Sequence, residues 1–149
     1  MNMKTIHLLF TIGLLALVTA CEKKPIDGNI EGMWKLEQFT TRADGTVHRD
    51  CPRIFYSIQL QIVELAEKQC THGYGTYVGH FYLNEDHSQA VMKDFKYRQS
   101  TGDNGEDVPV EKLLPYGINA TETTFDILKA DGKHLVLQSD YATLEFTSF

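Results

Sequence analysis

The reactive side chains of this sequence are three cysteines, Cys21, Cys51 and Cys70, and six histidines spread along the chain. The histidines after residue 20 show neither an i, i+4 pair around a glutamate nor the Cys/His spacing that is typical of zinc sites. No Gly-x-Ser-x-Gly elbow presents a nucleophile, and no glycine-rich phosphate loop follows a strand pattern. The sequence therefore predicts a protein that is not an enzyme and that holds no metal and no cofactor.

The first 20 residues have the three-part pattern of an export signal. Lys4 supplies the positive start, an apolar stretch runs from residue 6 to residue 18, and the small residues Thr19 and Ala20 precede Cys21. The apolar stretch is shorter than the roughly 20 residues that a membrane-spanning helix needs, and it fits the hydrophobic part of a secretory signal. We therefore predict that residues 1–20 are a signal peptide.

The run Leu17-Val18-Thr19-Ala20-Cys21 resembles the lipoprotein box of bacteria, in which small residues separate an aliphatic residue from the cysteine. The resemblance implies that the Cys21 thiol receives a diacylglycerol, that the signal is cut before it, and that the new amine is acylated, for example with palmitate. The chain would then be lipid-anchored to a membrane of a bacterial cell envelope. Glu22, where an aspartate is associated with the inner membrane, implies the outer membrane. The alternative is an ordinary signal peptide whose cysteine stands there by chance.

After the signal, the composition predicts a short tether and one domain. Residues 21–30 are polar and contain Pro25 and Gly28, which is typical of a flexible linker. Residues 31–149 are enough for one domain with one hydrophobic core. The chain of 149 residues has a net charge of −6, and its acidic residues are scattered apart from a modest cluster between 103 and 107. Because phosphate groups are bound by clustered lysine and arginine, we exclude nucleic acid as a partner.

The two remaining cysteines, Cys51 and Cys70, would lie in a compartment that permits disulfides. If residues 54–65 form one strand, a rise of about 3.3 Å per residue places its ends nearly 40 Å apart. A disulfide needs Cα atoms within about 7 Å of each other, so a bridge requires this strand to curl or its flanks to fold back. The disulfide and the free thiols both stay open at this point.

From residue 31 onward the dominant pattern has a period of two, which is typical of β-strands with one buried face. Further strand-like stretches include residues 74–83, 90–97 and three short runs near the C-terminus, two of them separated by the hairpin signal Asp131-Gly132. The long interruption at 100–119 predicts a polar loop followed by one helical turn at 110–114. The pattern predicts an all-β fold, an antiparallel up-and-down meander of about seven or eight strands closed into a barrel. An open sandwich is the alternative.

Several short motifs resemble those of a known family. Gly32-Met33-Trp34 resembles the Gly-x-Trp motif that opens lipocalins, and the order of the remaining motifs is similar to small lipocalin-like domains found as lipoproteins in bacterial envelopes. These motifs are a Leu-Leu-Pro-Tyr-Gly stretch at 113–117 and a terminal Tyr-Ala-x-Leu-x-Phe at 141–146. One position departs from the family, because lipocalins commonly stack an arginine near the last strand on the tryptophan, whereas the last arginine here is Arg98. The resemblance implies a lipocalin-like barrel.

The aromatic content suggests what such a barrel would do. An eight-stranded barrel is just wide enough to be filled by side chains or to hold one small ligand, and tyrosines suit a cavity because they join an apolar ring to a polar tip. Two hypotheses stay open. The first is a module that binds a small hydrophobic or amphipathic ligand. The second is an interaction or inhibitor module with a filled barrel, whose loop at 100–119 contacts a protein partner. For the first hypothesis, the predicted ligand-binding residues are Trp34, Tyr56, Ile58, Leu60, Tyr74, Val78, Phe125 and Leu137.

Overall fold

The computed structural model describes residues 27–51, 53–69 and 71–149. The predicted signal peptide, Cys21 and most of the predicted tether lie outside the described residues, as does Cys70. Within the described ranges, no helix is both long enough and apolar enough to span a bilayer. The elements are β1 (Gly32–Thr41), β2 (Val47–His48), β3 (Ile54–Gln59), β4 (Ile62–Glu67), β5 (Tyr77–Leu83), β6 (Gln89–Arg98), β7 (Asp103–Asp107), α2 (Val110–Leu113), η2 (Leu114–Tyr116), β8 (Glu122–Ala130), β9 (His134–Gln138) and β10 (Ala142–Ser148).

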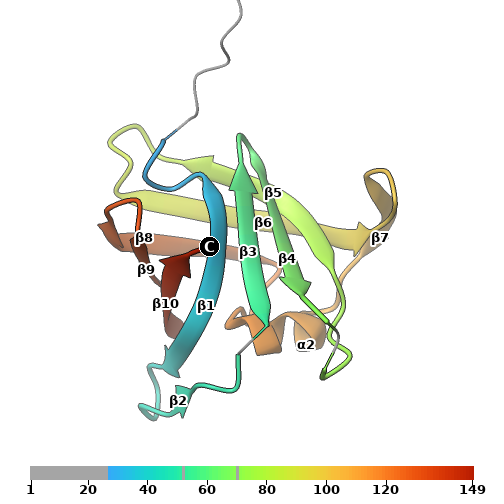
Figure 1. Ribbon diagram of the computed structural model, residues 1–149, viewed down its shortest axis with the longest axis horizontal. Coiled ribbons are helices and arrows are strands. Elements are labelled where there is room, and N and C mark those ends of the chain that lie inside the picture. The colour runs from blue at the N-terminus through green and yellow to red at the C-terminus, as the bar shows by residue number, and fades with distance from the viewer. Residues whose placement is uncertain (1–26, 52, 70) are drawn as a thin grey trace, which may run out of the picture.

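Eight of these strands form a closed antiparallel barrel (Figure 1). Hydrogen-bonded neighbours follow the order β1-β3-β4-β5-β6-β8-β9-β10, and β10 returns to β1. The closing ladder runs from the pair Trp34 and Ser148 to the pair Thr41 and Ala142. Two short strands are additions to this ring, since β2 pairs only with β1, and β7 pairs only with β6. The predicted all-β meander, its closure into a barrel and the short helical turn are confirmed.

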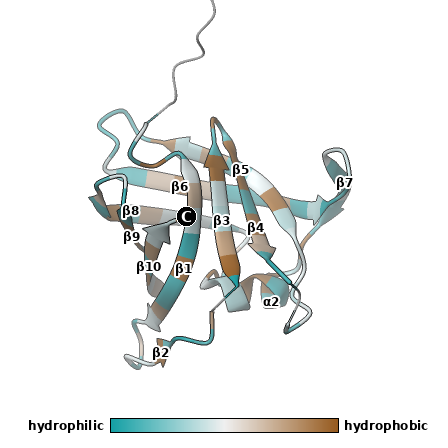
Figure 2. Cartoon of the chain, in the orientation of Figure 1, coloured by the Kyte–Doolittle hydropathy of each residue, from teal (hydrophilic) through white to brown (hydrophobic). Residues whose placement is uncertain are grey.

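The interior of the barrel is one continuous hydrophobic core. Along β1, β5 and β10 buried positions alternate with more exposed ones, because successive side chains of a strand point to opposite faces. Figure 2 shows the same alternation as hydrophobic and hydrophilic segments that follow one another along the strands. The largest fully buried aromatic side chains are Trp34, Tyr56, Tyr77, Phe81, Tyr116 and Phe125.

Residues 54–65 do not form one strand. β3 ends at Gln59 and β4 begins at Ile62, so the chain reverses at Leu60 and Gln61. Leu60 takes a left-handed conformation with φ of 55°, and its N–H donates to the Glu31 carboxylate over 2.6 Å. The alternation in the sequence continues through this turn, and the turn holds no glycine, asparagine or proline, so the pattern could not reveal it.

The reversal removes the geometric objection to a bridge between Cys51 and Cys70. Lys68 N–H donates to the Arg53 carbonyl oxygen over 2.7 Å, so the chain before β3 and the chain after β4 meet at the same end of the hairpin. Cys51 is a buried free thiol whose sulfur contacts the His48 carbonyl oxygen at 3.7 Å. Because Cys70 lies outside the described residues, the disulfide and the free thiols stay open as alternatives for this pair.

The loop predicted at 100–119 contains a strand that the sequence pattern did not reveal. β7 lies against the end of β6, and together they project from the barrel wall as a hairpin arm (Figure 1). Four of its five residues are exposed and the fifth is half-buried, so no alternation of apolar and polar residues marks this strand. Backbone pairing and an ion pair between Lys96 of β6 and Asp107 of β7 hold it in place.

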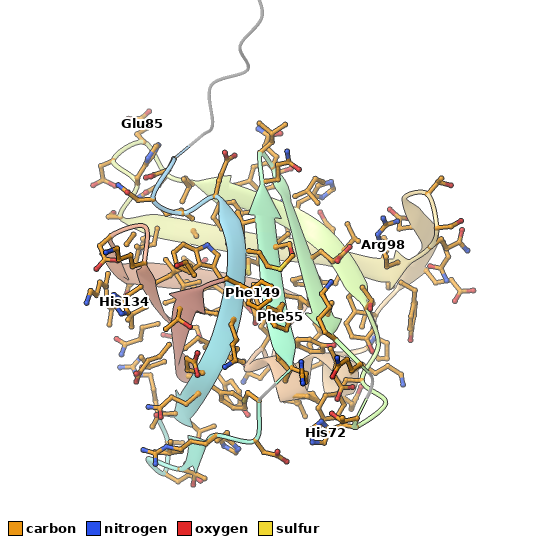
Figure 3. All side chains as sticks on the ribbon, viewed as in Figure 1. Phe55, His72, Glu85, Arg98, His134 and Phe149 are labelled. Atoms are coloured by element: carbon orange, nitrogen blue, oxygen red, sulfur yellow. The ribbon has the colours of Figure 1, made fainter. Side chains whose placement is uncertain are left out.

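The two ends of the barrel are closed by different segments. Near the start of β1, Trp34 is buried and its indole Nε1–H donates to the Ile30 carbonyl oxygen over 2.6 Å. Arg98, the last arginine, lies on the outside of the barrel and donates from its Nε to Glu64 over 3.0 Å (Figure 3). At the opposite end, α2 and η2 lie across the opening (Figure 1). We call this opposite end the mouth.

Candidate functional site

The structure brings five of the predicted ligand-binding residues together inside the barrel. Each of them is at most 2% exposed, and each belongs to the same core cluster. Their side chains fill the lumen against one another and against the closing segments. The five residues are Trp34, Tyr56, Ile58, Phe125 and Leu137. Their role in ligand binding stays a prediction.

The other three predicted residues lie elsewhere. Leu60 is in the β3–β4 turn, at the end of the barrel that carries Trp34. Val78 lies on the outer face of β5, because the inward positions of this strand are Tyr77, Gly79 and Phe81. The inward placement expected for Val78 is therefore wrong. Tyr74 stands apart from the lumen as well, but it is half-buried at the mouth.

Residues 109–118, which we call the plug, close the mouth. Leu113, Tyr116 and Ile118 are fully buried in the barrel end. The Tyr56 hydroxyl donates to the Tyr116 carbonyl oxygen over 2.5 Å, and the Tyr116 hydroxyl donates to the Gly75 carbonyl oxygen. Burial, with a smaller effect of Tyr116, raises the pKa of Tyr56 well above its usual range, so its hydroxyl stays a donor. The plug is thus bonded to β3 and to the segment between β4 and β5.

A cleft beside the plug, which we call the mouth cleft, has a volume of about 380 Å³. This volume lies within the range of small-molecule sites, roughly 300–1,000 Å³. Its lining joins aromatic, aliphatic and charged side chains that come from separate parts of the sequence. The lining residues are Phe39, Val47, His48, Arg49, Asp50, Cys51, Tyr74 and Pro115.

Of these lining residues, sequence reasoning identified only Tyr74 as a ligand-binding candidate. His48 belongs to β2, a strand of two residues, which is too short to show a periodic pattern. Phe39 reads as an ordinary inward residue of β1, and it meets His48 because the two are cross-strand partners. The only signal in the sequence is the closeness of His48 to Cys51, which by itself does not indicate a cleft.

A buried carboxylate fixes the wall of the mouth cleft that carries Tyr74. Glu67 is 4% exposed and accepts hydrogen bonds from Thr71 Oγ1 at 3.0 Å, from the N–H and ring Nδ1 of His72 at 2.7 Å each, and from Tyr74 N–H at 2.8 Å. Burial alone would raise the pKa of this carboxyl, but the hydrogen bonds outweigh burial and lower it to about 2. Glu67 therefore holds the loop after β4 in place as a charged acceptor.

His72 completes this cluster at the edge of the mouth. Its second ring nitrogen, Nε2, lies 3.3 Å from the Asp50 carboxylate. The hydrogen bond to Glu67, with a smaller contribution from Asp50, raises the pKa of His72 above its ordinary value of 6.5. Both ring nitrogens of the charged form are then bonded to carboxylates, so His72 acts as a bridge between two chain segments.

We expect the stability of the protein to be greatest between about pH 4.5 and pH 6.5, the ordinary pKa values of glutamate and histidine. The folded state lowers the pKa of Glu67, so its contribution is present above pH 4.5 and is lost as the pH falls toward 2. The folded state raises the pKa of His72, so its contribution is present below pH 6.5 and is lost as the pH rises through the raised value. Melting temperatures across this range measure both limbs.

The variant His72→Gln separates the two limbs of this profile. It should flatten the loss of stability on the alkaline side, while the loss on the acid side persists because Glu67 keeps its backbone donors. An alkaline limb that is unchanged in His72→Gln would show that other groups cause it.

Comparison with known proteins shows which family has this architecture. A family model described as a lipocalin-like domain matches residues 15–149. The solved structure of a lipocalin-like protein from Bacteroides uniformis is 19% identical, with a TM-score of 0.58, and the match covers 81% of this chain and 99% of that chain. An uncharacterized protein from Bacteroides eggerthii is 18% identical, with a TM-score of 0.60, and the match covers 80% of this chain and 98% of that chain. No curated protein matches this chain.

The family match includes the motifs on which the resemblance to lipocalins rested. The family model extends over every strand of the barrel, including the Gly-x-Trp motif on β1 and the closing strand β10. At identities of 19% and 18%, the two solved structures show the fold alone. The chain belongs to the family of lipocalin-like domain proteins.

Proposed function

We propose that this protein is a lipid-anchored lipoprotein of the bacterial cell envelope that binds a small hydrophobic or amphipathic molecule at the mouth cleft. The single observation that carries the binding role is the cleft itself, about 380 Å³ in volume and lined by Phe39, His48 and Tyr74 beside charged residues. Lipocalin-like domains are generally binding folds without enzymatic activity, which supports a binding role. The lipid anchor rests on the sequence around Cys21.

The mouth cleft suits an amphipathic molecule better than the lumen does. The inward side chains of the barrel are almost completely buried. A ligand inside the lumen would therefore have to displace the side chains of the protein core. At the mouth, aromatic rings offer apolar contact while Arg49 and Asp50 reach water at the rim. A ligand can therefore bind there without unfolding any strand.

Native mass spectrometry of the purified, lipid-modified protein tests this proposal. We expect a co-purified small molecule as a discrete mass increment that disappears in Tyr74→Ala. The matched control is Tyr82→Ala, since Tyr82 is an exposed tyrosine on the outer face of β5. This control should keep the increment. A protein that carries no adduct in any preparation would contradict the binding role.

The packed interior favours a second candidate function, an envelope interaction module that holds no ligand. Its candidate surface is the segment from β7 to the plug, because β7 projects from the barrel and most of its residues are exposed. Removing residues 100–106 should abolish capture of a protein partner from envelope extracts while the barrel stays folded. Capture that is unchanged by this deletion would count against the second candidate.

A further inference from the structure

One side of the mouth cleft is built from two stacked rings. Phe39 on β1 and His48 on β2 are cross-strand partners, and their rings stack with centroids 4.3 Å apart and planes 12° apart. Directly opposed side chains in an antiparallel pair hold each other in one arrangement. The short strand β2 thus presents a flat surface to the cleft.

A second pair of stacked rings lies on the segment after β4. The rings of His72 and Tyr74 are 4.9 Å apart with planes 9° apart. Tyr74 is also held from the plug, because its ring packs edge-on against Tyr116 at 6.4 Å. Since Glu67 fixes both the His72 ring and the Tyr74 backbone, this wall is rigid before any ligand arrives.

Two polar groups that line the cleft, the Cys51 thiol and the Tyr74 phenol, are uncharged at neutral pH. Burial raises the pKa of Cys51 to about 11, with smaller effects of Asp50 and Glu37. Burial likewise raises the pKa of Tyr74, with smaller effects of Asp50 and Glu67. The deeper part of the cleft therefore offers the apolar Phe39 ring, a neutral thiol and a neutral phenol, which favours a ligand with an uncharged body.

The rim carries one positive charge without a carboxylate partner. Arg49 donates from its Nε to the amide oxygen of Gln38 over 3.0 Å, and among the described residues no carboxylate forms an ion pair with its guanidinium. The neighbouring carboxylate, Asp50, faces Nε2 of His72 at 3.3 Å. On a chain with a net charge of −6, this exposed guanidinium is a local site for an anion.

We infer that the mouth cleft binds a flat aromatic carboxylate, with its ring against His48 and Tyr74 and its carboxylate at Arg49. Walls built from flat aromatic rings favour a planar body over a puckered one, because a flat ring makes fuller contact with an aromatic face. The guanidinium of Arg49 can hold a carboxylate through two parallel hydrogen bonds. This inference rests on the proposed function and names the ligand class of the same cleft.

Three probes test the two halves of this inference by isothermal titration calorimetry on the purified, lipid-modified protein. The probes are 2-naphthoate, its saturated counterpart decahydro-2-naphthoate, and the uncharged 2-naphthylmethanol. We expect 2-naphthoate to bind about tenfold more tightly than either of the others. Arg49→Gln should weaken 2-naphthoate by about tenfold and leave 2-naphthylmethanol unchanged. Arg53→Gln, an exposed arginine outside the cleft, is the matched control and should change neither.

Each outcome separates this inference from the proposed function. Equal binding of the saturated and aromatic acids overturns the preference for a flat ring, and unchanged binding in Arg49→Gln overturns the carboxylate contact; in both cases a ligand cleft remains. If none of the three probes binds to a protein that carries a co-purified molecule, the ligand class is wrong and the binding function stands. If no probe binds and no adduct is found, both are overturned. Tyr74→Leu, which removes the ring and keeps apolar volume, should weaken 2-naphthoate as a second variant of the site.

Discussion

Replacing Glu67 with glutamine is expected to lower the free energy of unfolding by about 3 kcal/mol, because a buried charged acceptor is removed from several donors at once. One carboxylate oxygen accepts from Thr71 and twice from His72, and the other accepts from Tyr74 N–H. A glutamine side chain offers only one oxygen, so its NH₂ group must face an N–H donor. Urea unfolding followed by circular dichroism measures the change as a lower midpoint at constant slope.

Glu64→Gln is the matched control for this prediction. Glu64 belongs to the same strand, β4, but it lies partly exposed and pairs with Arg98 at the surface. Exposed ion pairs contribute at most about 1 kcal/mol, so this variant should unfold close to the wild-type midpoint. Equal losses in both variants would contradict the structural role that we assign to Glu67.

Cys21→Ser is expected to move the protein from the membrane fraction to the aqueous fraction. The proposed anchor consists of several acyl chains on one residue, and each buried methylene adds about 0.8 kcal/mol to membrane binding. Serine has no thiol to accept the diacylglycerol, so the whole anchor is lost in one step. Detergent phase partitioning of cell lysates, with detection of the protein in each phase, measures the change.

Cys51→Ser controls for the general loss of a thiol. Cys51 is buried at the mouth and lies far along the chain from the proposed anchor, so this variant should partition like the wild type. A Cys21→Ser protein that still enters the detergent phase would show that something other than a lipid on this residue holds it there.

The sequence predicted the barrel because its strands obey one simple rule. Inward and outward positions alternate along β1, β5 and β10, and alternation is a local property that can be seen without knowing which strands meet. The alternation did not reveal the turn between β3 and β4, because there the hydrophobic pattern continues while the backbone changes direction. At Leu60 the alternation runs on while the chain turns back, because a carboxylate from Glu31 supports a left-handed residue that no turn motif marks.

The mouth cleft was largely hidden for a different reason. Phe39, His48, Tyr74 and Pro115 come from four separate segments, and only the closure of the barrel and the docking of the plug place them together. Glu67 reads as a surface residue, since glutamates on strands usually face water. Its burial depends on donors that follow it in the chain, Thr71, His72 and Tyr74, and a pattern of hydrophobicity does not register such donors.

The position of the plug determines the side from which the proposed ligand would be exchanged. The plug closes one end of the barrel, and the described chain begins beside the other end (Figure 1). A strand of ten residues such as β1 is about 33 Å long, whereas residues 22–26 reach no further than about 20 Å. With the proposed lipid on Cys21, the mouth cleft would lie at the end of the barrel away from the headgroups. Uptake and release would then take place through water, and lateral diffusion within the bilayer would not deliver cargo to it.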